Sequence, residues 1–469
     1  MLASRGVGHP YRGMPFDPQA YRPATALLDL GDAFGDPVGP ADFPETILRF
    51  RNDRAAAEIG LAGLDEPEWL RHLARFAPLP GSLPQPLALR YHGHQFRSYN
   101  PEIGDGRGFT FAQVRDDGGR LMDLGTKGSG TTPWSRFGDG RLTLKGGVRE
   151  ILATEMLEAL NVPTSRTLSL VETGEALHRG DEPSPTRSAV LVRLSHGHIR
   201  IGTFQRLAYE RDEENMRRLV GYVLANLYDE APSGGGDDPA RLLHLVVGRT
   251  ATLAARYMAA GFVHGVLNSD NINVTGESFD YGPWRFAPSW DPGFTAAYFD
   301  QTGLYAFARQ PEAIGWDVMQ LASSLRLIAE SDPLVAALDT FAPRFQAALA
   351  EAVTWRLGVV ATDAAAATTL VRAVERTLLE TQVPLDRFFF DAFGGALPDG
   401  YGDEWADVRA HLAATTPRKD RAHPYWSGDP CSMLIDEVEA LWSPIAEHDD
   451  WSPLHAKVTA IRAMGDAMK

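Results

Sequence analysis

The chain has 469 residues, of which 44% are hydrophobic, and 45 basic against 61 acidic residues give it a formal net charge of −16. This length and composition indicate a folded protein of several structural units, and the acidic balance argues against a nucleic-acid-binding surface. No run of about 18 apolar residues occurs and the N-terminus lacks the apolar core of a signal peptide, so we expect a cytoplasmic protein without membrane or nucleic-acid partners and, by default, a monomer.

The predicted elements change from strands to helices along the chain. A helical stretch is expected at 42–61, a hairpin at 109–125 around an Asp-Asp-Gly-Gly turn, and a helix at 146–163 with apolar residues at helical spacing. Beyond residue 310 nearly every periodic segment is helical. The sequence thus predicts an α+β, two-lobed, protein-kinase-like fold. Its expected segments are an N-terminal arm and helical extension (1–87), a strand-rich nucleotide-binding lobe (88–211), a helical lobe with the catalytic and metal-binding loops (212–330) and a helical C-terminal extension (331–469).

Residues 264–282, HGVLNSDNINVTGESFDYG, resemble the catalytic and metal-binding loops of a protein kinase. Val266, however, stands where the catalytic aspartate would be, and valine cannot accept a proton. Asp270 is the carboxylate of this loop that could replace the missing aspartate. Its alternative, purely structural role would be that of a turn or capping residue. Asn271 and Asp280 carry the kinds of oxygen ligand that Mg²⁺ prefers.

Phosphoryl and nucleotidyl transfer depend on positioning and on cations that face phosphate oxygens. The Gly-Asp-Gly-Arg-Gly string at 104–108 could approach phosphates closely, but such a short string is more often an ordinary turn. Lys127 and Glu150 follow the order of the nucleotide lysine and helix glutamate of kinases, or are two solvated charges. Arg193 and Arg200 could clamp a polyphosphate or form surface ion pairs.

Other site classes find little support in the sequence. Two His-x-His pairs, at 92–94 and 196–198, invite a zinc site, but no third and fourth ligand stands out. The Gly-x-Ser-x-Gly elbow of serine hydrolases and the P-loop of ATPases do not occur. Cys431 is the only cysteine, which excludes an intrachain disulfide and a cysteine-rich metal site.

Longer motifs together resemble the selenoprotein O family of kinase-like protein adenylyltransferases. They are GHQF at 93–96, IGDGRG at 103–108, KGSGTTPWSRFGDGR at 127–141, VREILATE at 148–155, SHGHIRIGTF at 195–204 and GFVHGVLNSDNINVTGESFDYGPWRF at 261–286. The resemblance covers roughly residues 88–320. It implies transfer of AMP from ATP to Ser, Thr or Tyr hydroxyls of proteins, self-modification included. It also implies that ATP binds flipped relative to kinases, with the α-phosphate facing the acceptor.

The resemblance also implies roles for individual residues. Asp270 would accept the proton, and Asn271 and Asp280 would hold Mg²⁺ or Mn²⁺. Glu150 would pair with Lys127. The residues implied to contact the nucleotide are Gly104, Gly106, Arg107, Lys127, Asp139, Gly140, Arg193, Arg200 and Asp280.

The chain departs from the family pattern in two places. Residues 131–137 read TTPWSRF where family members usually have Arg-Thr-Pro-Tyr-Ser-Arg-Arg, so two arginines are missing. The C-terminal motif with a redox-active cysteine or selenocysteine is also missing, and redox control by an internal disulfide is not expected.

Two functions are the alternatives to an adenylyltransferase. One is a conventional kinase that uses Asp270, and the other is a non-catalytic nucleotide-binding scaffold.

Overall fold

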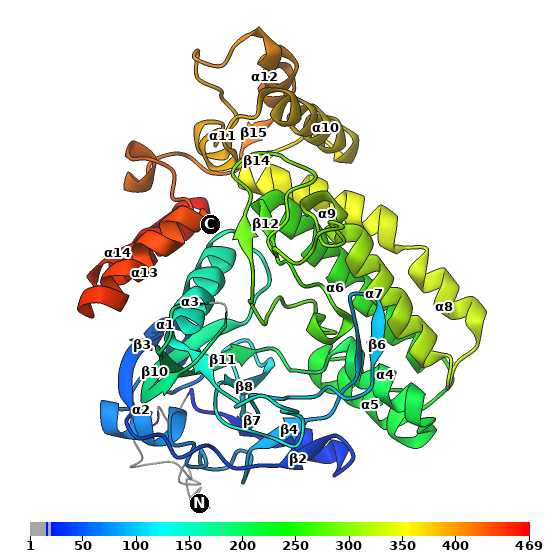
Figure 1. The fold of residues 1–469 in the computed structure, drawn as a ribbon. Helices are drawn as coiled ribbons and strands as arrows, with labels where there is room; N and C mark the ends of the chain where they lie inside the picture. The colour runs from blue at the N-terminus through cyan, green and yellow to red at the C-terminus, as the bar shows by residue number, and fades with distance from the viewer. Residues whose placement is uncertain (1–15, 17–19, 181) are drawn as a thin grey trace, which may run out of the picture.

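The computed structural model describes residue 16, residues 20–180 and residues 182–469, and it combines one large sheet with many helices (Figure 1). The strands of the sheet come from the first 195 residues, and most helices follow them in the sequence. The predicted α+β class agrees with this architecture. The kinase-like arrangement in two lobes and the segment boundaries at 87, 211 and 330 stay predictions.

Within the described residues the large sheet has nine strands, and its neighbouring strands pair antiparallel. The strand order is β2-β4-β7-β8-β11-β10-β3, while β1 pairs with β7 and β9 pairs with β11. The strands are β1 (Pro23–Ala24), β2 (Gly35–Pro37), β3 (Ile47–Arg51), β4 (Leu87–Leu89), β7 (Thr110–Arg115), β8 (Leu121–Lys127), β9 (Leu142–Thr143), β10 (Arg166–Leu177) and β11 (Thr186–Ser195). The predicted hairpin at 109–125 is confirmed as β7 and β8. Because β8 is central and buried along its whole length, it holds Lys127, its last residue, in a fixed position.

The N-terminal segment contributes strands to the sheet, so it is more than an arm and a helical extension. The predicted helix at 42–61 is wrong over Ile47–Arg51, because these residues form β3 and pair with β10 at the sheet edge. Only α1 (Asp53–Glu58) is helical there, and the Asn52 side chain caps it by accepting a hydrogen bond from the Ala55 N–H. Pairing with an available strand outweighs local helical propensity. Residues 1–15 and 17–19 of the predicted arm lie outside the described residues.

Helix α3 (Leu144–Ala159) packs between the sheet and the C-terminal helices α13 (Ile435–His448) and α14 (Ser452–Met468) (Figure 1). Thr143 caps its N-terminus by accepting a hydrogen bond from the Gly146 N–H over 3.1 Å. Arg462 of α14 forms an ion pair with Glu155 of α3, 2.5 Å between Nη2 and Oε1. The C-terminal extension is therefore anchored on the same helix that carries Glu150.

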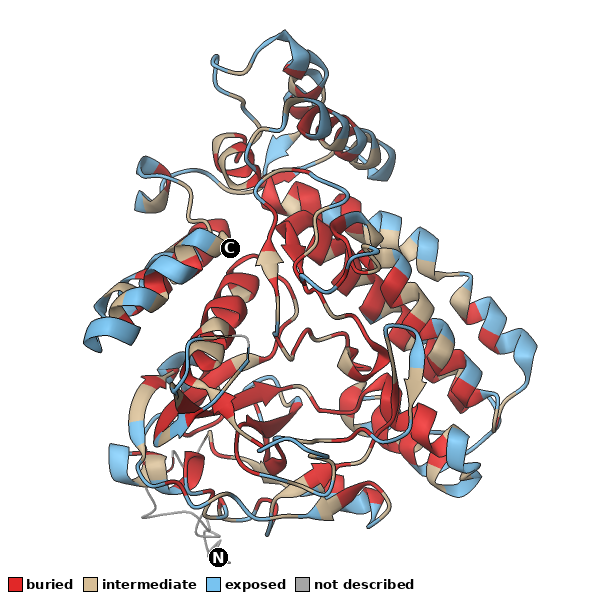
Figure 2. Ribbon diagram, in the orientation of Figure 1, coloured by how far each residue is buried: buried red, intermediate tan, exposed pale blue. Residues whose placement is uncertain are grey.

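Beside the sheet, α4 to α9 form a layered bundle with α6 at its buried centre, and α10 to α12 extend it away from the sheet (Figure 1 and Figure 2). The helices not yet given bounds are α2 (Glu66–Leu73), α4 (Ile201–Glu210), α5 (Glu213–Leu227), α6 (Asp238–Ala260), α7 (Gln310–Leu325), α8 (Ser331–Leu338), α9 (Phe341–Arg356), α10 (Ala364–Thr381), α11 (Leu385–Asp391) and α12 (Ala406–Ala413). α2 lies at the sheet end of the molecule rather than in the bundle (Figure 1). Over the described ranges, none of the helices has the length and apolar character needed to cross a bilayer.

Three short strand pairs among the described residues complete the fold, and two of them, β5–β6 and β12–β13, adjoin the loop at 264–282. They are β5 (Gly93–Gln95) with β6 (Ser98–Asn100), β12 (Phe262–Val263) with β13 (Arg285–Phe286), and β14 (Val359–Val360) with β15 (Thr416–Pro417). The β12–β13 pair joins the two ends of the loop, so a long excursion of chain starts and finishes at one place. A short 3₁₀ helix at Ser269–Asn271 then presents Asp270.

The β5–β6 hairpin reaches across to this loop and packs on it. The His94 N–H donates a hydrogen bond to Ser269 Oγ over 2.7 Å, and the Phe96 N–H donates one to Asn268 Oδ1 over 3.0 Å. Gly93 permits the contact, because a Cβ there would lie 2.9 Å from Asp270 Cβ. The hairpin therefore fixes the position of Asp270.

Candidate active site

A pocket of about 650 Å³ lies between the strand-rich segment and the loop at 264–282. Two of the predicted site residues, Glu150 and Asn271, are not among the residues that line it. The others do line it: Gly104, Gly106, Arg107, Lys127, Asp139, Gly140, Arg193, Arg200, Asp270 and Asp280. The fold thus gathers residues separated by up to 176 positions in the sequence around one space.

Lys127 is buried at this pocket and binds two carboxylates. Its Nζ forms an ion pair with Glu150 of α3 and lies 2.9 Å from Asp280 Oδ1. The Lys127–Glu150 pair expected from the resemblance is therefore present. Because β8 and α3 are both firmly packed, the ammonium group is held in place rather than solvated.

Asp280 carries a negative charge in a strongly positive environment. Burial raises the pKa of its carboxyl, but Lys127, Arg193 and further arginines outweigh this and hold the pKa well below its usual range. Its backbone is in the left-handed region, with φ at 64°, which few non-glycine residues adopt. Such strain at a pocket is typical of functional positions.

Asp270 differs from Asp280 although both carboxylates face the same pocket. Burial raises the pKa of Asp270 to about 7, and the nearby Arg200 opposes this only in part. Its Oδ1 is buried and accepts no hydrogen bond from the described residues. A buried carboxylate oxygen without a donor and with a raised pKa suits a group that takes up a proton.

Two pocket arginines have hydrogen-bonding capacity left over. Nε and Nη1 of Arg193 and Nε of Arg200 are buried without an acceptor among the described residues. Buried donors of this kind are rare unless a ligand or water satisfies them. The pocket is therefore equipped to receive an anion.

Arg200 brings two residues into the site that sequence reasoning did not assign. Its Nη1 lies 3.0 Å from Asp105 Oδ1, and its guanidinium lies 4.1 Å from the ring centroid of Tyr91. Asp105 belongs to the IGDGRG motif, so its charge and its place two residues before Arg107 could have identified it as a site residue. Tyr91 had no such signal, because only the fold brings it next to Arg200.

The glycines at 104 and 106 serve close packing against the loop that follows β8. A Cβ at Gly104 would lie 2.5 Å from Trp134 Cγ, and one at Gly106 would lie 2.9 Å from the Trp134 carbonyl oxygen. The Trp134 indole N–H in turn donates a hydrogen bond to Asp36 over 2.9 Å. These contacts fix the wall of the pocket opposite Asp270.

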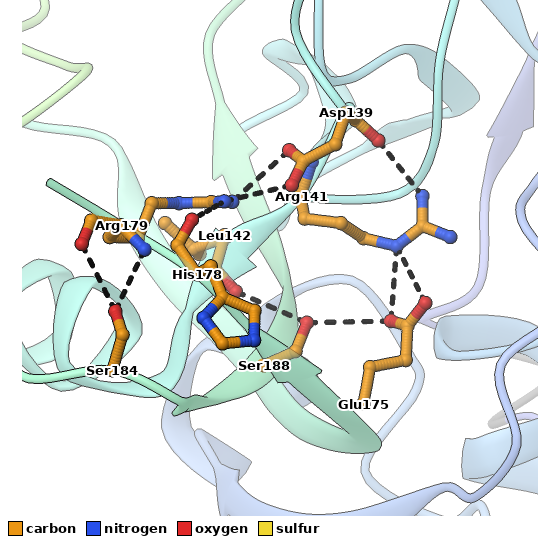
Figure 3. Close-up of polar contacts among 8 residues, drawn as sticks. All are labelled: Asp139, Arg141, Leu142, Glu175, His178, Arg179, Ser184 and Ser188. Carbon is orange, nitrogen blue, oxygen red and sulfur yellow. Dashed lines mark hydrogen bonds and ion pairs between the residues drawn. The ribbon is translucent and has the colours of Figure 1, made fainter.

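Asp139 is held at the pocket rim by Arg179, with 2.8 Å between Oδ2 and Nη1 (Figure 3). In the same group Arg141 pairs with Glu175 over 2.9 Å (Figure 3). Arg179 comes from the loop between β10 and β11, a segment for which the sequence predicts no function. It closes the rim from a second strand connection.

The residues proposed as metal ligands fit a magnesium site of the nucleotide type rather than a cage of protein side chains. The Asn271 amide N–H donates to the Val266 carbonyl over 3.1 Å, which leaves its oxygen for a ligand. Across the described part of the chain, no group of three or more His, Cys, Asp or Glu side chains could hold a metal. Two protein ligands completed by phosphate oxygens and water are common for Mg²⁺.

The residues of the two His-x-His pairs form hydrogen bonds with protein groups. They are His92, His94, His196 and His198.

The chain is similar to known proteins over nearly its whole length. A protein nucleotidyltransferase YdiU of Synechocystis sp. is 42% identical over 96% of this chain and 99% of its own. Proteins of the same name are 40% identical in Synechococcus elongatus, over 98% of this chain and 97% of theirs, and 42% identical in Gloeobacter violaceus, over 94% and 95%. The family model described as protein adenylyltransferase SelO matches residues 18–395. The chain therefore belongs to the SelO family of protein adenylyltransferases.

Proposed function

We propose that this protein transfers AMP from ATP to Ser, Thr or Tyr hydroxyls of proteins, itself included. The observation that carries the proposal is the pocket in which Lys127 binds Glu150 and Asp280 while Asp270 faces the same space with a pKa near 7. The family membership supports the choice of nucleotidyl transfer over other reactions of such a pocket. A kinase-like two-lobed fold and a cytoplasmic location, where ATP is available, complete the proposal.

In this reaction the acceptor oxygen attacks the α-phosphorus of ATP. The bond from the α-phosphorus to the bridging oxygen breaks, pyrophosphate leaves, and the acceptor proton passes to Asp270. Asp270 suits this step because its buried carboxylate has an unpaired oxygen. Val266 is no obstacle, since the base comes from a position four residues later in the same loop.

The cations around the pocket would hold the triphosphate. Arg193 and Arg200 offer buried N–H donors, and Lys127 is fixed by Glu150 so that it needs no rearrangement. Gly104, Gly106 and Arg107, with Asp139 and Gly140 on the opposite rim, would contact the nucleotide. Its flipped orientation follows from the family resemblance.

Asn271 and Asp280 would hold Mg²⁺ or Mn²⁺. The ionised Asp280 carboxylate and the Asn271 amide oxygen are hard oxygen donors that suit either ion. When bound, the metal would neutralise charge on the phosphates. The protein residues supply the remaining positioning and proton acceptance.

Parallel reactions with α-labelled and γ-labelled ATP test the proposal. We expect label on protein only from the α position, and metal chelation should abolish it. Label only from the γ position would contradict the proposal in favour of a kinase. Thermal stabilisation by ATP without label from either position would favour a non-catalytic scaffold.

A further inference from the structure

A second cleft of about 760 Å³ adjoins the pocket and shares Arg107, Lys127, Arg141 and Arg179 with it. Its other walls come from the start of α3, from residues 281–285 and 296–299, and from α13 of the C-terminal extension. We call it the basic cleft. Ile435 and Glu439 of α13 close one side of the cleft. The cleft therefore depends on a part of the chain that lies outside the family motifs of the sequence.

The basic cleft carries a charge opposite to that of the whole protein. Among the described residues that line it, two are acidic, Glu182 and Glu439. The formal net charge of the chain is −16, so this excess of positive charge is local. The basic lining residues are Arg107, Lys127, Arg141, Lys145, Arg149, Arg179 and Arg285.

Part of this positive charge is not neutralised within the protein. Four of the cations form ion pairs: Lys127 with Glu150 and Asp280, Arg141 with Glu175, Lys145 with Glu439, and Arg179 with Asp139. Arg107, Arg149 and Arg285 form no ion pair with the described residues, although Arg107 contributes to the lowered pKa of the Asp280 carboxyl. Arg149 instead donates to the carbonyl oxygens of Gly282 and Trp284. Three guanidinium groups that form no ion pair therefore line one cleft, and such a lining favours binding of an anionic ligand.

The nucleotide does not account for the whole basic cleft. The first pocket has a volume within the usual range for a ligand of that size and has its own arginines, Arg193 and Arg200. Neither of them lines the basic cleft, and neither Arg149 nor Arg285 lines the first pocket. The two spaces therefore share four cations, while Arg193 and Arg200 line only the first pocket and Lys145, Arg149 and Arg285 line only the basic cleft.

A row of aromatic side chains leads from the basic cleft towards Asp270. Tyr298 and Phe299 line the cleft and are 85% and 45% exposed. The Phe299 ring lies 5.8 Å from the Phe96 ring, and Phe96 sits on the hairpin that packs against the Asp270 loop. An extended chain that lies on these rings could therefore occupy the cleft and reach the catalytic carboxylate.

We propose that the basic cleft binds an acidic segment of the acceptor protein and thereby selects hydroxyls flanked by Asp or Glu. The proposal rests on the proposed adenylyl transfer, whose acceptor it specifies. Charge complementarity favours this occupant, because carboxylates can pair with Arg149 and Arg285, which line only the basic cleft, and the exposed aromatic rings suit a polypeptide.

Fluorescence anisotropy with labelled peptides tests this binding without requiring catalysis. One probe is a 12-residue peptide with a central threonine flanked by glutamates, and its matched control has glutamines at those positions. We expect the full-length protein to bind the glutamate peptide about tenfold more tightly, with the difference shrinking as salt is added. A nonhydrolysable ATP analogue should leave this binding in place, because the nucleotide occupies the other pocket.

Three variants locate the binding. Arg285→Glu, whose side chain forms no ion pair among the described residues, should weaken the glutamate peptide about five- to tenfold and leave the glutamine peptide unchanged. Glu439→Gln removes a carboxylate from the cleft and should strengthen binding, so the proposal does not depend on one substitution. Arg372→Glu on the exposed side of α10, away from the cleft, should change neither peptide.

Specific results would overturn the proposal. Equal binding of the two peptides, or no response to both Arg285→Glu and Glu439→Gln, would contradict it. Displacement of the peptide by pyrophosphate or ATP would assign the cleft to phosphates, and tighter Arg285-dependent binding of single-stranded DNA would assign it to nucleic acid. If the α-label experiment fails while the peptide results hold, the adenylyl transfer is wrong and the acidic docking site stands.

Discussion

Lys127 Nζ lies 2.9 Å from Asp280 Oδ1 while it also binds the buried Glu150. This arrangement joins a central strand, the helix behind it and the loop at 264–282 through one side chain. It stabilises the ionised form of Asp280, and in the proposed reaction it would let a firmly packed lysine face the phosphates of the nucleotide.

The Lys127–Glu150 pair should matter for stability as well as for catalysis. Lys127→Met leaves Glu150, which is 1% exposed, as a buried charge without its partner. We expect a loss of about 3–5 kcal/mol in the free energy of unfolding, measured by urea denaturation, together with loss of transfer. The double variant Lys127→Met/Glu150→Leu should recover much of the stability but no activity. Arg217→Ala, in an exposed pair with Glu213, should cost no more than about 1 kcal/mol.

Asp270→Asn should separate catalysis from nucleotide binding. The amide keeps the shape of the carboxylate but cannot accept the proton, so kcat should fall by about 10²- to 10⁴-fold. Calorimetry should show that ATP still binds, because the arginines and Lys127 are unchanged. Asp332→Asn, at an exposed position in the first turn of α8, serves as the control. An Asp270→Asn protein with full turnover would remove Asp270 from the mechanism.

Gly104→Ala should damage the nucleotide pocket. The added Cβ would meet the Trp134 ring, whose indole is tied to Asp36, so the pocket wall must move. We expect KM for ATP to rise about tenfold, measured in steady-state transfer assays. Gly39→Ala is the matched control, because nothing lies within 4 Å of its added Cβ. Equal KM values for both variants would show that the contact with Trp134 does not shape the site.

Stability should fall in acid through Glu172 at the sheet edge. Burial raises the pKa of Glu172, but hydrogen bonds from Arg187 and Arg49 outweigh this and hold the pKa below its ordinary value of 4.5. The folded state therefore binds fewer protons at Glu172 than the unfolded state does. This stabilisation is fully present above the ordinary pKa of 4.5, and it is lost as the pH falls from there through the lowered pKa of the folded state. Urea unfolding at pH 7 and pH 3.5 should show the loss, and Glu172→Gln should reduce it. The exposed Glu330→Gln should not.

Arg187 makes the same network relevant to the C-terminal extension. It also binds Asp449 over 2.7 Å and donates to the Ile445 carbonyl at the end of α13. As the pH falls, α13 should therefore detach from the sheet before the whole protein unfolds. Limited proteolysis can detect this as new cleavage between residues 431 and 451. Uniform protection of this segment at low pH would contradict the link.

Much of the site could be predicted because its residues lie in contiguous motifs. The Lys127–Glu150 pair followed from its order along the chain, and the position of Asp270 followed from its neighbour Asn271. Asp105 was within reach, since it lies inside a motif that was already singled out. Tyr91 and Arg179 could not be predicted, because only strand pairing and loop packing bring them to the pocket.

The fold was predictable where local pattern and tertiary structure agree. The Asp-Asp-Gly-Gly turn predicted the hairpin of β7 and β8, and helical spacing predicted α3. The prediction failed at β3, where Ile47–Arg51 are flanked by helix-forming residues but pair with β10. That pairing joins residues more than 100 positions apart, as in Glu172 with Ile47, and no local pattern reports it.

The most direct test of adenylyl transfer is tandem mass spectrometry of proteins incubated with this protein, ATP and Mg²⁺. We expect Ser, Thr or Tyr residues that carry one adenylyl group, formed with release of pyrophosphate, and at least about 100-fold slower labelling when Asp270→Asn replaces the wild type. Residues that carry a phosphoryl group instead, or labelling by Asp270→Asn at the rate of the wild type, would contradict the proposed adenylyl transfer.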